Sequence, residues 1–538
     1  MKMSARRVRR GLLIIASAAA AIFGAAPLHV AAAAYSGTAQ NGFSGPTGLT
    51  GSDGLGEPTI VHDSANRLFV TAPQAIGNVN TAGGSPMFTS SDGGNTWSSP
   101  VRDPYCTAFS GGDTDLAVDN TDDVYQTDLY LVNSCVGVST DHGGSFAAGD
   151  VFGTQTIPGD DRPWVAFNSS TNQLYYTFDS LRSIDVTNTV STSNALARVQ
   201  SITETTVIPE CLLSLCGMAI PGPVPVGVRA CVCPPGGIAA DNSVGGTHSH
   251  TGRVYVSFSH QQGTAIAHGD PVGTCPACGV LTWVMPPTVI ADASSGSAFQ
   301  DEWNFDPIKV DANGTVYVMW AHAPTYTNRV ANTVKIEYAY STDGGATFST
   351  PVTVSTEPGT TTFPTMDVVS PGVLDVAWYG DPQHTTDPNL AKGPWNVYYA
   401  RITGADTNSP SITSPQIGGG STSGPEIAVS GMHNNACIQT GGNGSAQCSD
   451  RSLLDFFQLT DDTCGNPNII YTGGDAGQGV GTLLYFTKLA LNPCTVTGNP
   501  PVPEAPWVPL LMAPAAGIGV LLLRRKHGQS LSRKGHIR

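Results

Sequence analysis

The apolar and polar positions of the chain repeat as one two-strand unit. A short apolar strand leads into a turn of Asp, Asn or Gly, and a second strand rich in Val, Tyr and Trp follows. The clearest copy runs from Asp306 to Trp320. Such residues suit pleated strands joined by polar turns, so each copy predicts a β-hairpin. The seven copies begin at Pro58, Asp115, Arg162, Gly237, Asp306, Phe363 and Leu454.

Successive copies begin about 50 to 90 residues apart, and no long amphipathic helical pattern competes with them. Repeated β-units that close into a ring leave few exposed edges, which favours an all-β propeller. We expect six or seven blades, because the seventh copy could either form its own blade or complete the first. A row of β-sandwich domains is the alternative. A Cys- and Pro-rich insertion near residues 209–235 interrupts the pattern.

A second motif, S-x-D-x-G-x-[TS]-[WF], occurs three times and follows the hairpins in phase. A degenerate copy without the aspartate lies at residues 191–195. The aspartate can accept backbone N–H bonds and fix a turn, and the glycine tolerates positive φ. The motif residues are Ser90, Asp92, Gly94 and Trp97, then Ser139, Asp141, Gly143 and Phe146, then Ser341, Asp343, Gly345 and Phe348.

These three motifs resemble the Asp-boxes of sialidases and other BNR-repeat proteins, and the resemblance covers most of residues 57–491. It implies a sialidase-like β-propeller. It also implies that the boxes lie on outer turns away from the active site, so that Asp92, Asp141 and Asp343 have a structural role.

The first 34 residues have the pattern of a secretory signal peptide: a cationic start, the apolar stretch 11–26 and small residues at 31–34. A retained N-terminal anchor is the alternative. Residues 35–56 are then expected to be a linker that leads into a propeller over residues 57–495.

The C-terminal end predicts a membrane anchor. A Pro-rich linker at 496–506 precedes the apolar segment 507–523, and the basic tail 524–538 follows. A bilayer core needs about 20 apolar residues, so the segment is short but usable, and the basic tail is expected in the cytoplasm. The layout resembles bacterial surface-sorting signals, although it has no clean sortase or Pro-Glu-Pro motif. A merely apolar tail is the alternative, since Pro509 and Pro514 fit a helix poorly.

Charge narrows the range of partners. Five of the 25 basic residues lie in the predicted signal and six in the tail, which leaves 14 basic and 41 acidic residues, a net charge of −27, on the body. Such a surface repels phosphates and anionic headgroups, so we exclude nucleic-acid binding.

Twelve cysteines in an exported chain are expected to form disulfides. The predicted local pairs are Cys106 with Cys135, Cys437 with Cys448, and Cys464 with Cys494. The six others gather in one stretch at Cys211, Cys216, Cys231, Cys233, Cys275 and Cys278. Zinc binding is the alternative there, because the spacing of Cys231–Cys233 and of Cys275–Cys278 could also suit zinc.

The resemblance raises the question of sialidase activity, for which the family uses three arginines on the sugar carboxylate, a Tyr nucleophile with a Glu partner, and an Asp acid/base. Here the first copy opens with Glu57-Pro58-Thr59 and has no arginine. The nearest match to the family's early arginine motif is Asp161-Arg162-Pro163 in the third copy. The candidate catalytic residues are Asp161, Arg162, Arg253, Arg401 and Arg451.

In a propeller the first strands line the axis, and here their entry loops are mostly acidic. Such a mouth would repel the carboxylate of sialic acid. The acids could instead be solvated or bonded to backbone, or bind Ca²⁺; no other cofactor or metal is implied. The acids are Glu57, Asp113, Asp115, Asp160, Asp161, Asp301, Glu302, Asp450 and Asp455.

Aromatic residues near predicted strand ends could stack on sugar rings, or pack between blades: Trp303, Trp378, Tyr379 and Trp395. The sequence therefore predicts an exported cell-surface propeller that binds glycans or surface proteins without catalysis. The alternative is an exo-α-sialidase.

Overall fold

A computed structural model describes the chain from residue 42 to 494. It divides into two units, Met1–Ala34 and Tyr35–Arg538, of which the first lies outside the described residues. The predicted apolar segments 11–26 and 507–523 also lie outside them, and no described helix is long and apolar enough to cross a membrane. Within 42–494 the description omits residues 45, 74–83, 107–109, 131–132, 153–159, 181–183, 209–234, 261–262, 274–280, 292–305, 324, 328–329, 333, 382–394, 415, 421–455 and 475–481.

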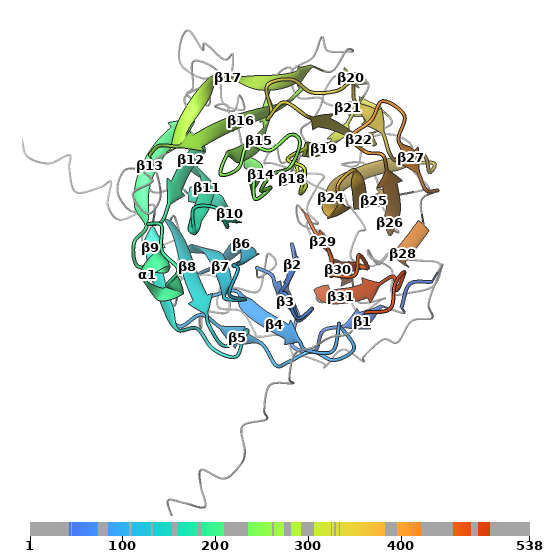
Figure 1. Ribbon diagram of the computed structural model, residues 1–538. Helices are drawn as coiled ribbons and strands as arrows, with labels where there is room; N and C mark the ends of the chain where they lie inside the picture. Colours follow the sequence, from blue (N-terminus) through green and yellow to red (C-terminus); the bar gives the residue numbers. More distant parts are fainter. Residues whose placement is uncertain are drawn as a thin grey trace, which may run out of the picture. The chain divides into compact units, whose positions relative to one another are not determined.

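The described strands form seven blades around a central axis (Figure 1), so the chain is an all-β, seven-bladed propeller. Each blade is an antiparallel sheet whose first strand lies nearest the axis. Blade 1 comprises β2 (Thr59–His62), β3 (Leu68–Thr71), β4 (Pro86–Ser90) and β5 (Val101–Arg102). Blade 2 comprises β6 (Ser110–Val118), β7 (Val124–Tyr130), β8 (Asn133–Ser139) and β9 (Ala148–Phe152). Blade 3 comprises β10 (Asp160–Asn168), β11 (Gln173–Ser180), β12 (Ile184–Asn188) and β13 (Thr203–Ile208), with helix α1 (Ala195–Val199) between the last two.

The remaining blades follow the same order, and two of them carry additions. Blade 4 comprises β14 (Pro235–Ala240), β15 (Val254–His260), β16 (Gly263–Pro271) and β17 (Leu281–Ala291). Blade 5 comprises β18 (Ile308–Val310), β19 (Val316–His322), β22 (Lys335–Ser341) and β23 (Val352–Thr353), with an inserted hairpin of β20 (Thr325–Thr327) and β21 (Val330–Asn332). Blade 6 comprises β24 (Thr360–Ser370), β25 (Val373–Asp381), β26 (Asn396–Thr403) and β27 (Ser411–Ile412), and β28 (Gln416–Gly420) also pairs with β26.

Blade 7 joins the two ends of the propeller. Its strands are β29 (Gln458–Asp461), β30 (Pro467–Gly474), β31 (Thr482–Lys488) and, as the outermost, β1 (Thr47–Gly48). The six-blade interpretation is therefore wrong: the seventh repeat forms its own blade, which an N-terminal strand completes. The expected linker 35–56 contributes to this closure, because Phe43 also bridges to Leu489.

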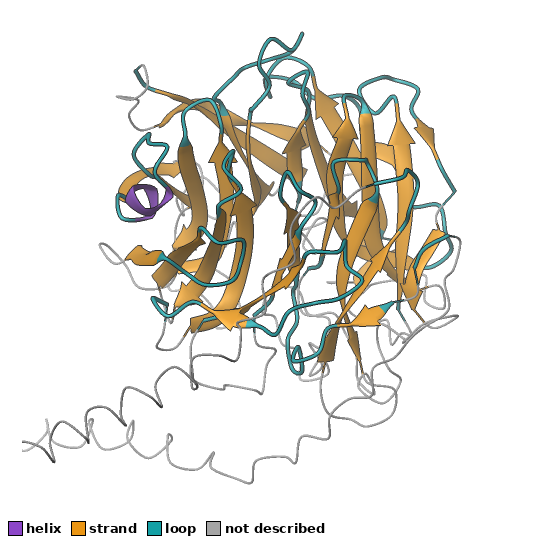
Figure 2. Cartoon of the chain, turned by 60° about the horizontal axis from the view of Figure 1, so that its bottom comes forward, coloured by secondary structure: helices purple, strands orange, loops and turns teal. Residues whose placement is uncertain are grey.

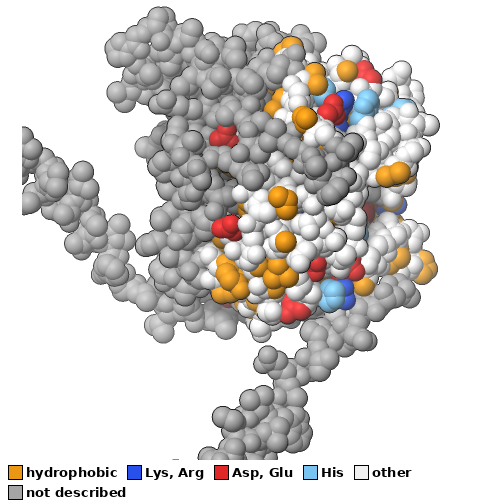
Figure 3. Space-filling model, turned by 60° about the vertical axis from the view of Figure 1, so that its left-hand side comes forward, with side chains coloured by type: hydrophobic (Ala, Val, Ile, Leu, Met, Phe, Trp, Pro, Cys, Tyr) orange, Lys and Arg blue, Asp and Glu red, His pale blue; other side chains and the backbone are white. Residues whose placement is uncertain are grey.

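Packing explains why second strands such as β3, β19 and β25 are almost continuously buried. Every residue of β19 is buried, because blade 5 is covered on both sides by its neighbours. Tyr317 and Met319 from this strand share one apolar cluster with Val376 and Trp378 of blade 6. Figure 2 shows the sheets standing side by side. The outer side near α1 carries scattered charged groups among uncharged ones (Figure 3).

Candidate functional site

The propeller has two chemically different faces. In each antiparallel blade, the turn between the first and second strands lies on the same side as the turn between the third and fourth. The Asp-boxes occupy three of the latter turns, so we call this side the Asp-box face. Connections between blades lie on the opposite side, which we call the entry face. The entry mouth is the opening of the axis there.

The three Asp-boxes have the same hydrogen bonds. Asp92 Oδ1 accepts from Ser90 Oγ at 2.9 Å and from the Thr96 backbone N at 2.8 Å, and Oδ2 accepts from Thr96 Oγ1 at 2.6 Å. Asp141 and Asp343 repeat this pattern with the serine two residues before and the hydroxyl residue four after. Burial opposes ionisation, but these bonds prevail and lower the pKa of each of the three aspartates.

The boxes also join neighbouring blades. Gly94 has φ +86°, and a Cβ there would clash with the ring of Phe486 in blade 7. Trp97 packs edge-on against the same ring at 5.2 Å. Gly143 and Gly345 also have positive φ and lie close to blades 1 and 4, respectively. The boxes therefore hold each turn against the preceding blade, far from the entry mouth.

Helix α1 follows the degenerate motif copy in blade 3. Asn194 caps the helix by accepting from the Ala197 backbone N at 3.1 Å. Arg198 is buried at 2% exposure and reaches Asp119 of blade 2 at 2.6 Å, with Tyr125 as a second partner. A buried ion pair thus joins blades 2 and 3 where a full box is missing.

A second turn motif on this face went unrecognised in the sequence. Asp63, Asp119, Asp311 and Asp462 each accept from the backbone N–H groups two and four residues later. All four stand between the first and second strands of their blades. The recurring turn aspartates were visible in the sequence, but their common bonding pattern required the structure.

Two candidate arginines lie on the Asp-box face rather than at the mouth. Arg253 directly precedes β15 and makes paired bonds of 2.8 Å to both oxygens of Asp270. Its third bond, also 2.8 Å, is to the carbonyl of Gly344 in the next blade's Asp-box. The hydrogen bond from Arg253 lowers the pKa of Asp270, and it outweighs burial, which acts in the opposite direction.

Arg401 holds the buried carboxylate of Asp375 through Nε at 2.6 Å and through Nη2, and it donates to the Gly465 carbonyl of blade 7 at 2.8 Å. Asp461 lies beside this pair, and burial, Asp375 and Asp367 raise its pKa. Burial and the two neighbouring aspartates therefore favour the protonated form of Asp461. Arg401 thus joins blades 6 and 7.

Arg162 lies at the entry end of blade 3, in a bulge between Asp161 and Trp164. Its φ is +58°, and Glu57 and Phe363 have φ of +52° and +50°. Each of the three precedes a proline directly before regular pairing of a first strand. Non-glycine residues in this region are strained by about 1–3 kcal/mol and cluster at functional sites. Arg451 lies outside the described residues.

An aromatic pair crosses the axis near this level. Trp164 of blade 3 packs edge-on against Phe456 of blade 7, with ring centroids 5.0 Å apart. The Trp164 Nε1 donates to the Pro235 carbonyl of blade 4 at 2.7 Å, which fixes its orientation. Blades 3 and 7 are not neighbours, so this pair spans the axis beneath the mouth.

The predicted stacking aromatics are core residues. Trp378 and Tyr379 have no exposed surface, and Trp395 is 1% exposed. Trp303 lies outside the described residues. The three that are described are therefore buried in the core rather than exposed for stacking on a sugar.

Polar side chains connect the first strands farther along the axis. Asp115 accepts from the Val165 backbone N at 3.0 Å and from Gln458 Nε2 at 3.5 Å. Burial raises its pKa to about 6, so this predicted mouth acid is a buried acceptor.

A second polar group links four blades around Asp367. Lys309 Nζ lies 3.4 Å from Asp367 Oδ1, and Thr460 Oγ1 donates to Oδ2 at 3.0 Å. Thr460 in turn lies 3.2 Å from Nδ1 of His62. No sequence pattern marks these four residues, because they converge only when the ring closes.

Two buried carboxyl groups lie between blades 1 and 2. Asp128 accepts from the Ser85 backbone N and from the Gly111 backbone N, the latter at 3.0 Å. Burial raises the pKa of Asp128 to about 7 and that of Asp103 to about 6. These bonds join Asp128 to the entry end of the blade 2 first strand.

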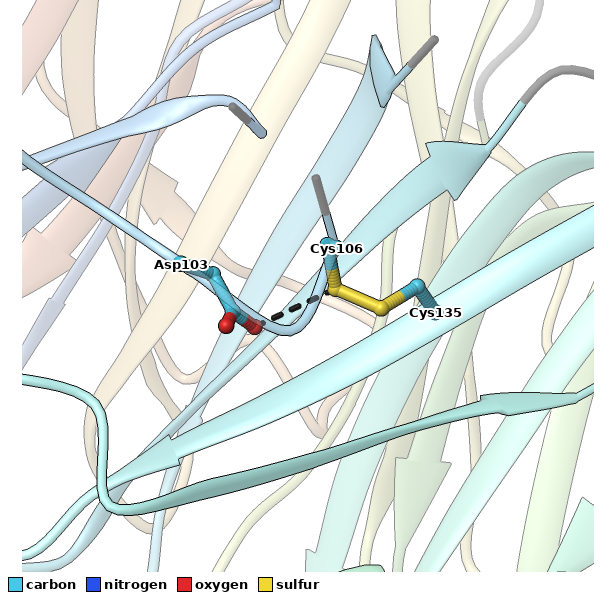
Figure 4. Close-up of side chains that lie close together, drawn as sticks. All are labelled: Asp103, Cys106 and Cys135. Atoms are coloured by element: carbon cyan, nitrogen blue, oxygen red, sulfur yellow. Dashed lines mark hydrogen bonds between the residues drawn. A yellow bond between two sulfur atoms is a disulfide. The ribbon is translucent and has the colours of Figure 1, made fainter. Parts of the chain in front are cut away.

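Two of the predicted disulfides are present: Cys106–Cys135 and Cys464–Cys494, with Cα atoms 6.0 and 5.7 Å apart. Figure 4 shows Asp103 beside the first, with Oδ2 3.1 Å from the Cys106 Sγ. A disulfide sulfur has no proton, so a hydrogen bond here requires a protonated Asp103. The eight other cysteines, Cys437 and Cys448 included, lie outside the described residues.

Among the described residues, two groups bring possible metal-ligand atoms close together. One is Asp103 with Cys106 and Cys135, and the other is Asp462 with Cys464 and Cys494. Their sulfurs are bonded to each other and offer no thiolates. Neither group lies among the acids predicted to form a Ca²⁺-binding mouth, of which Asp301, Glu302, Asp450 and Asp455 lie outside the described residues.

No family model and no curated protein matches the sequence. Solved structures resemble the fold. The polysaccharide lyase Uly1 is 11% identical with a TM-score of 0.40, and the alignment covers 81% of this chain and 90% of that one. The NanB sialidase from Streptococcus pneumoniae is 9% identical (TM-score 0.38, 87% and 72% covered). The GH93 α-L-arabinofuranosidase of Fusarium graminearum is 10% identical (TM-score 0.37, 82% and 95% covered).

Proposed function

We propose that this protein is an exported, surface-held propeller that binds glycans at its entry mouth and does not hydrolyse sialosides. The observation that carries the proposal is the make-up of the entry positions, which lie one or two residues before the regular pairing of the seven first strands begins. These positions are Glu57, Gly112 and Asp113, Arg162, Pro235 and Gly236, Asp306, Phe363, and Phe456. They contain a single arginine and three acids.

A sialidase clamp needs three arginines on one carboxylate. Arg253 and Arg401 are engaged on the opposite face, where each holds an aspartate and a backbone carbonyl. Moving either to the mouth would leave a carboxylate without its cation. Among the described candidates this leaves Arg162 as the one guanidinium near the mouth.

The entry acids favour a ligand that is rich in hydroxyl groups and low in negative charge. Asp113 is the half-buried one of the three, whereas Glu57 and Asp306 are buried at 4% and 0% exposure. Carboxylates accept hydrogen bonds from sugar hydroxyls, whereas they repel uronates, sulfates and sialic acid. The body's net charge of −27 extends this preference to longer range. Neutral glycans are therefore the ligand class that we propose.

A glycan array with the purified full-length chain in detergent tests the proposal. We expect binding to neutral glycans, weakened by Asp113→Asn, because Asp113 is the entry acid that is not buried, and retained by Asp53→Ala, which removes one exposed charge from the loop between β1 and β2. Equal binding by wild type and Asp113→Asn would argue against the mouth as the site. No binding to any neutral glycan would refute the ligand class.

Sialidase activity remains the second candidate because Arg162 stands in an Asp-Arg-Pro segment with a strained backbone at the mouth. Hydrolysis of a fluorogenic sialoside distinguishes the two. Turnover of ~1 s⁻¹ or more, abolished by Arg162→Ala, would replace the binding proposal with the enzymatic one.

Surface attachment rests on the sequence pattern at the two ends. We expect the full-length chain to fractionate with membranes or cell wall, and deletion of residues 507–538 to release it into the medium. Full-length protein that is already free in the medium with its tail intact would contradict attachment.

A further inference from the structure

The last described residues are fastened tightly to the Asp-box face. Cys494 is bonded to Cys464, which lies in the turn between β29 and β30. Asn466 in this turn accepts from the backbone N of Leu491 and of Asn492, both at 2.7 Å. Asn492 Nδ2 donates back to the Cys464 carbonyl at 2.8 Å. The path of the chain out of the propeller is therefore fixed at one turn.

Blade 1 reinforces the same point. Asn66, in the turn between β2 and β3, accepts from the Thr463 backbone N at 2.8 Å, and its Nδ2 lies 3.3 Å from the Cys494 Sγ. The exit point is thus bonded to both blades that meet at the ring closure. A pull on the chain beyond Cys494 is transmitted through the disulfide and these bonds to blades 7 and 1 rather than unravelling β31.

Twelve residues, 495–506, separate this point from the predicted apolar segment. A Pro-rich chain extends by about 3.1 Å per residue, so these twelve reach about 37 Å. The propeller is about as tall: β24 has 11 residues, which at about 3.3 Å each span about 36 Å. A linker that starts on the Asp-box face and ends beneath the entry face would need to cover this height and also pass around the rim.

From this geometry we propose that the Asp-box face is turned toward the cell envelope, so that the entry mouth opens to the medium. The proposal rests on the proposed C-terminal attachment and adds a direction to it. The partner of the Asp-box face is the envelope surface that holds residues 507–523. The partner of the entry face is a ligand that arrives from outside.

Two engineered cysteines test the orientation in the full-length protein on intact cells. Val244 is 81% exposed in the turn between β14 and β15 on the Asp-box face, and Thr356 is exposed between β23 and β24 on the entry face. A bulky polymer-linked maleimide labels each variant before and after detergent release. We expect Val244→Cys to react several-fold more slowly on cells than after release, and Thr356→Cys to react at similar rates in both. Wild type is the blank for the native cysteines.

A matched variant with a long Gly/Ser insert between residues 495 and 506 controls for linker length. The insert should bring the labelling rate of Val244→Cys on cells up to its rate after release, because slack lets the propeller turn over. Equal protection of the two positions, or protection of Thr356→Cys alone, would overturn the orientation. Unlabelled cells with intact full-length protein in the medium would instead show that the attachment itself is wrong.

Discussion

The two faces of the propeller place their carboxyl groups and their backbone in different environments. On the Asp-box face, turns repeat one hydrogen-bond pattern, and those bonds lower the pKa of Asp92, Asp141 and Asp343. At the entry end, first strands begin with bulges and strained residues, and burial raises the pKa of Asp128.

This difference distinguishes the Asp-box turns, which stabilise the fold, from the entry positions, where we propose that the ligand binds. The Asp-box turns satisfy their own polar groups and hold each blade against the one before it. The entry positions of blades 1, 3 and 6 retain unfavourable backbone angles that the surrounding ring enforces. Positive φ also occurs in turns of the Asp-box face, but there it falls on Asn, Asp and His, which adopt it most readily, whereas Glu57, Arg162 and Phe363 are residue types that rarely do. Strain of this kind persists where neighbouring structure over-determines it, which is typical of binding sites.

The largest expected effect is a pH dependence of the entry side. The pKa of Asp128 is about 7 in the folded chain against 3.8 unfolded, so its contribution to stability is present below pH 4 and is lost as pH rises through 7. A shift of about three units corresponds to at most about 4 kcal/mol. Hydrogen exchange should show weaker protection at Ser85 and Gly111 at pH 8 than at pH 5, after correction for intrinsic rates.

The Asp-box turns provide the internal control, since their depressed pKa values have the opposite sign. Their contribution is present above pH 4 and is lost on acidification, so the Thr96 and Thr347 amides should keep their protection between pH 5 and 8. Asp128→Asn should flatten the pH dependence at Ser85 and Gly111 and leave the Thr96 and Thr347 amides unchanged. Parallel loss of protection on both faces would show that the contrast between them is not electrostatic.

Arg401→Met should be the most destabilising single change at an arginine considered for the clamp. It leaves the Asp375 carboxylate buried without its cation, at a cost of about 3 kcal/mol in the free energy of unfolding. Denaturant unfolding measures the loss, and the double variant Arg401→Met, Asp375→Asn should recover much of it. Normal stability with lost ligand binding would place Arg401 at the mouth instead.

Asp343→Ala should cost about 2 kcal/mol, because the backbone N of Thr347 and two hydroxyl groups lose their acceptor. Thermal or chemical unfolding would measure it. The glycan affinity of the molecules that remain folded should not change. The exposed Asp53→Ala is the matched control for lost charge, and an equal loss of stability there would refute a specific role of the box.

The smallest expected effect is on the stability of two glycine variants, made at residues with positive φ on opposite faces. Arg162→Gly and His142→Gly, with φ of +58° and +61°, should each relieve backbone strain and change stability by about 1 kcal/mol or less. Glycan titration should show weaker binding for Arg162→Gly alone. Identical affinities in both variants would remove Arg162 from the site.

The sequence was a good guide wherever the deciding contacts were local. The Asp-box spacing specifies hydrogen bonds between residues that are two and four positions apart. The disulfides Cys106–Cys135 and Cys464–Cys494 each join cysteines that are about 30 residues apart in the sequence. The phase of the repeats also separated Arg162 from Arg253 and Arg401. It did not reveal that the last two each hold an aspartate of their own blade and a carbonyl of the next.

What the sequence by itself determined is the unit: a hairpin of known composition, its turn chemistry and its sevenfold repetition. Only the closed ring decided that β1 completes blade 7, that Trp164 meets Phe456 across the axis, and that Gln458 reaches Asp115, 343 residues away. The physical reason is that hydrogen bonds within a turn depend on a few consecutive dihedral angles. Contacts at the axis depend instead on the accumulated rotation of all seven blades, which no local pattern records.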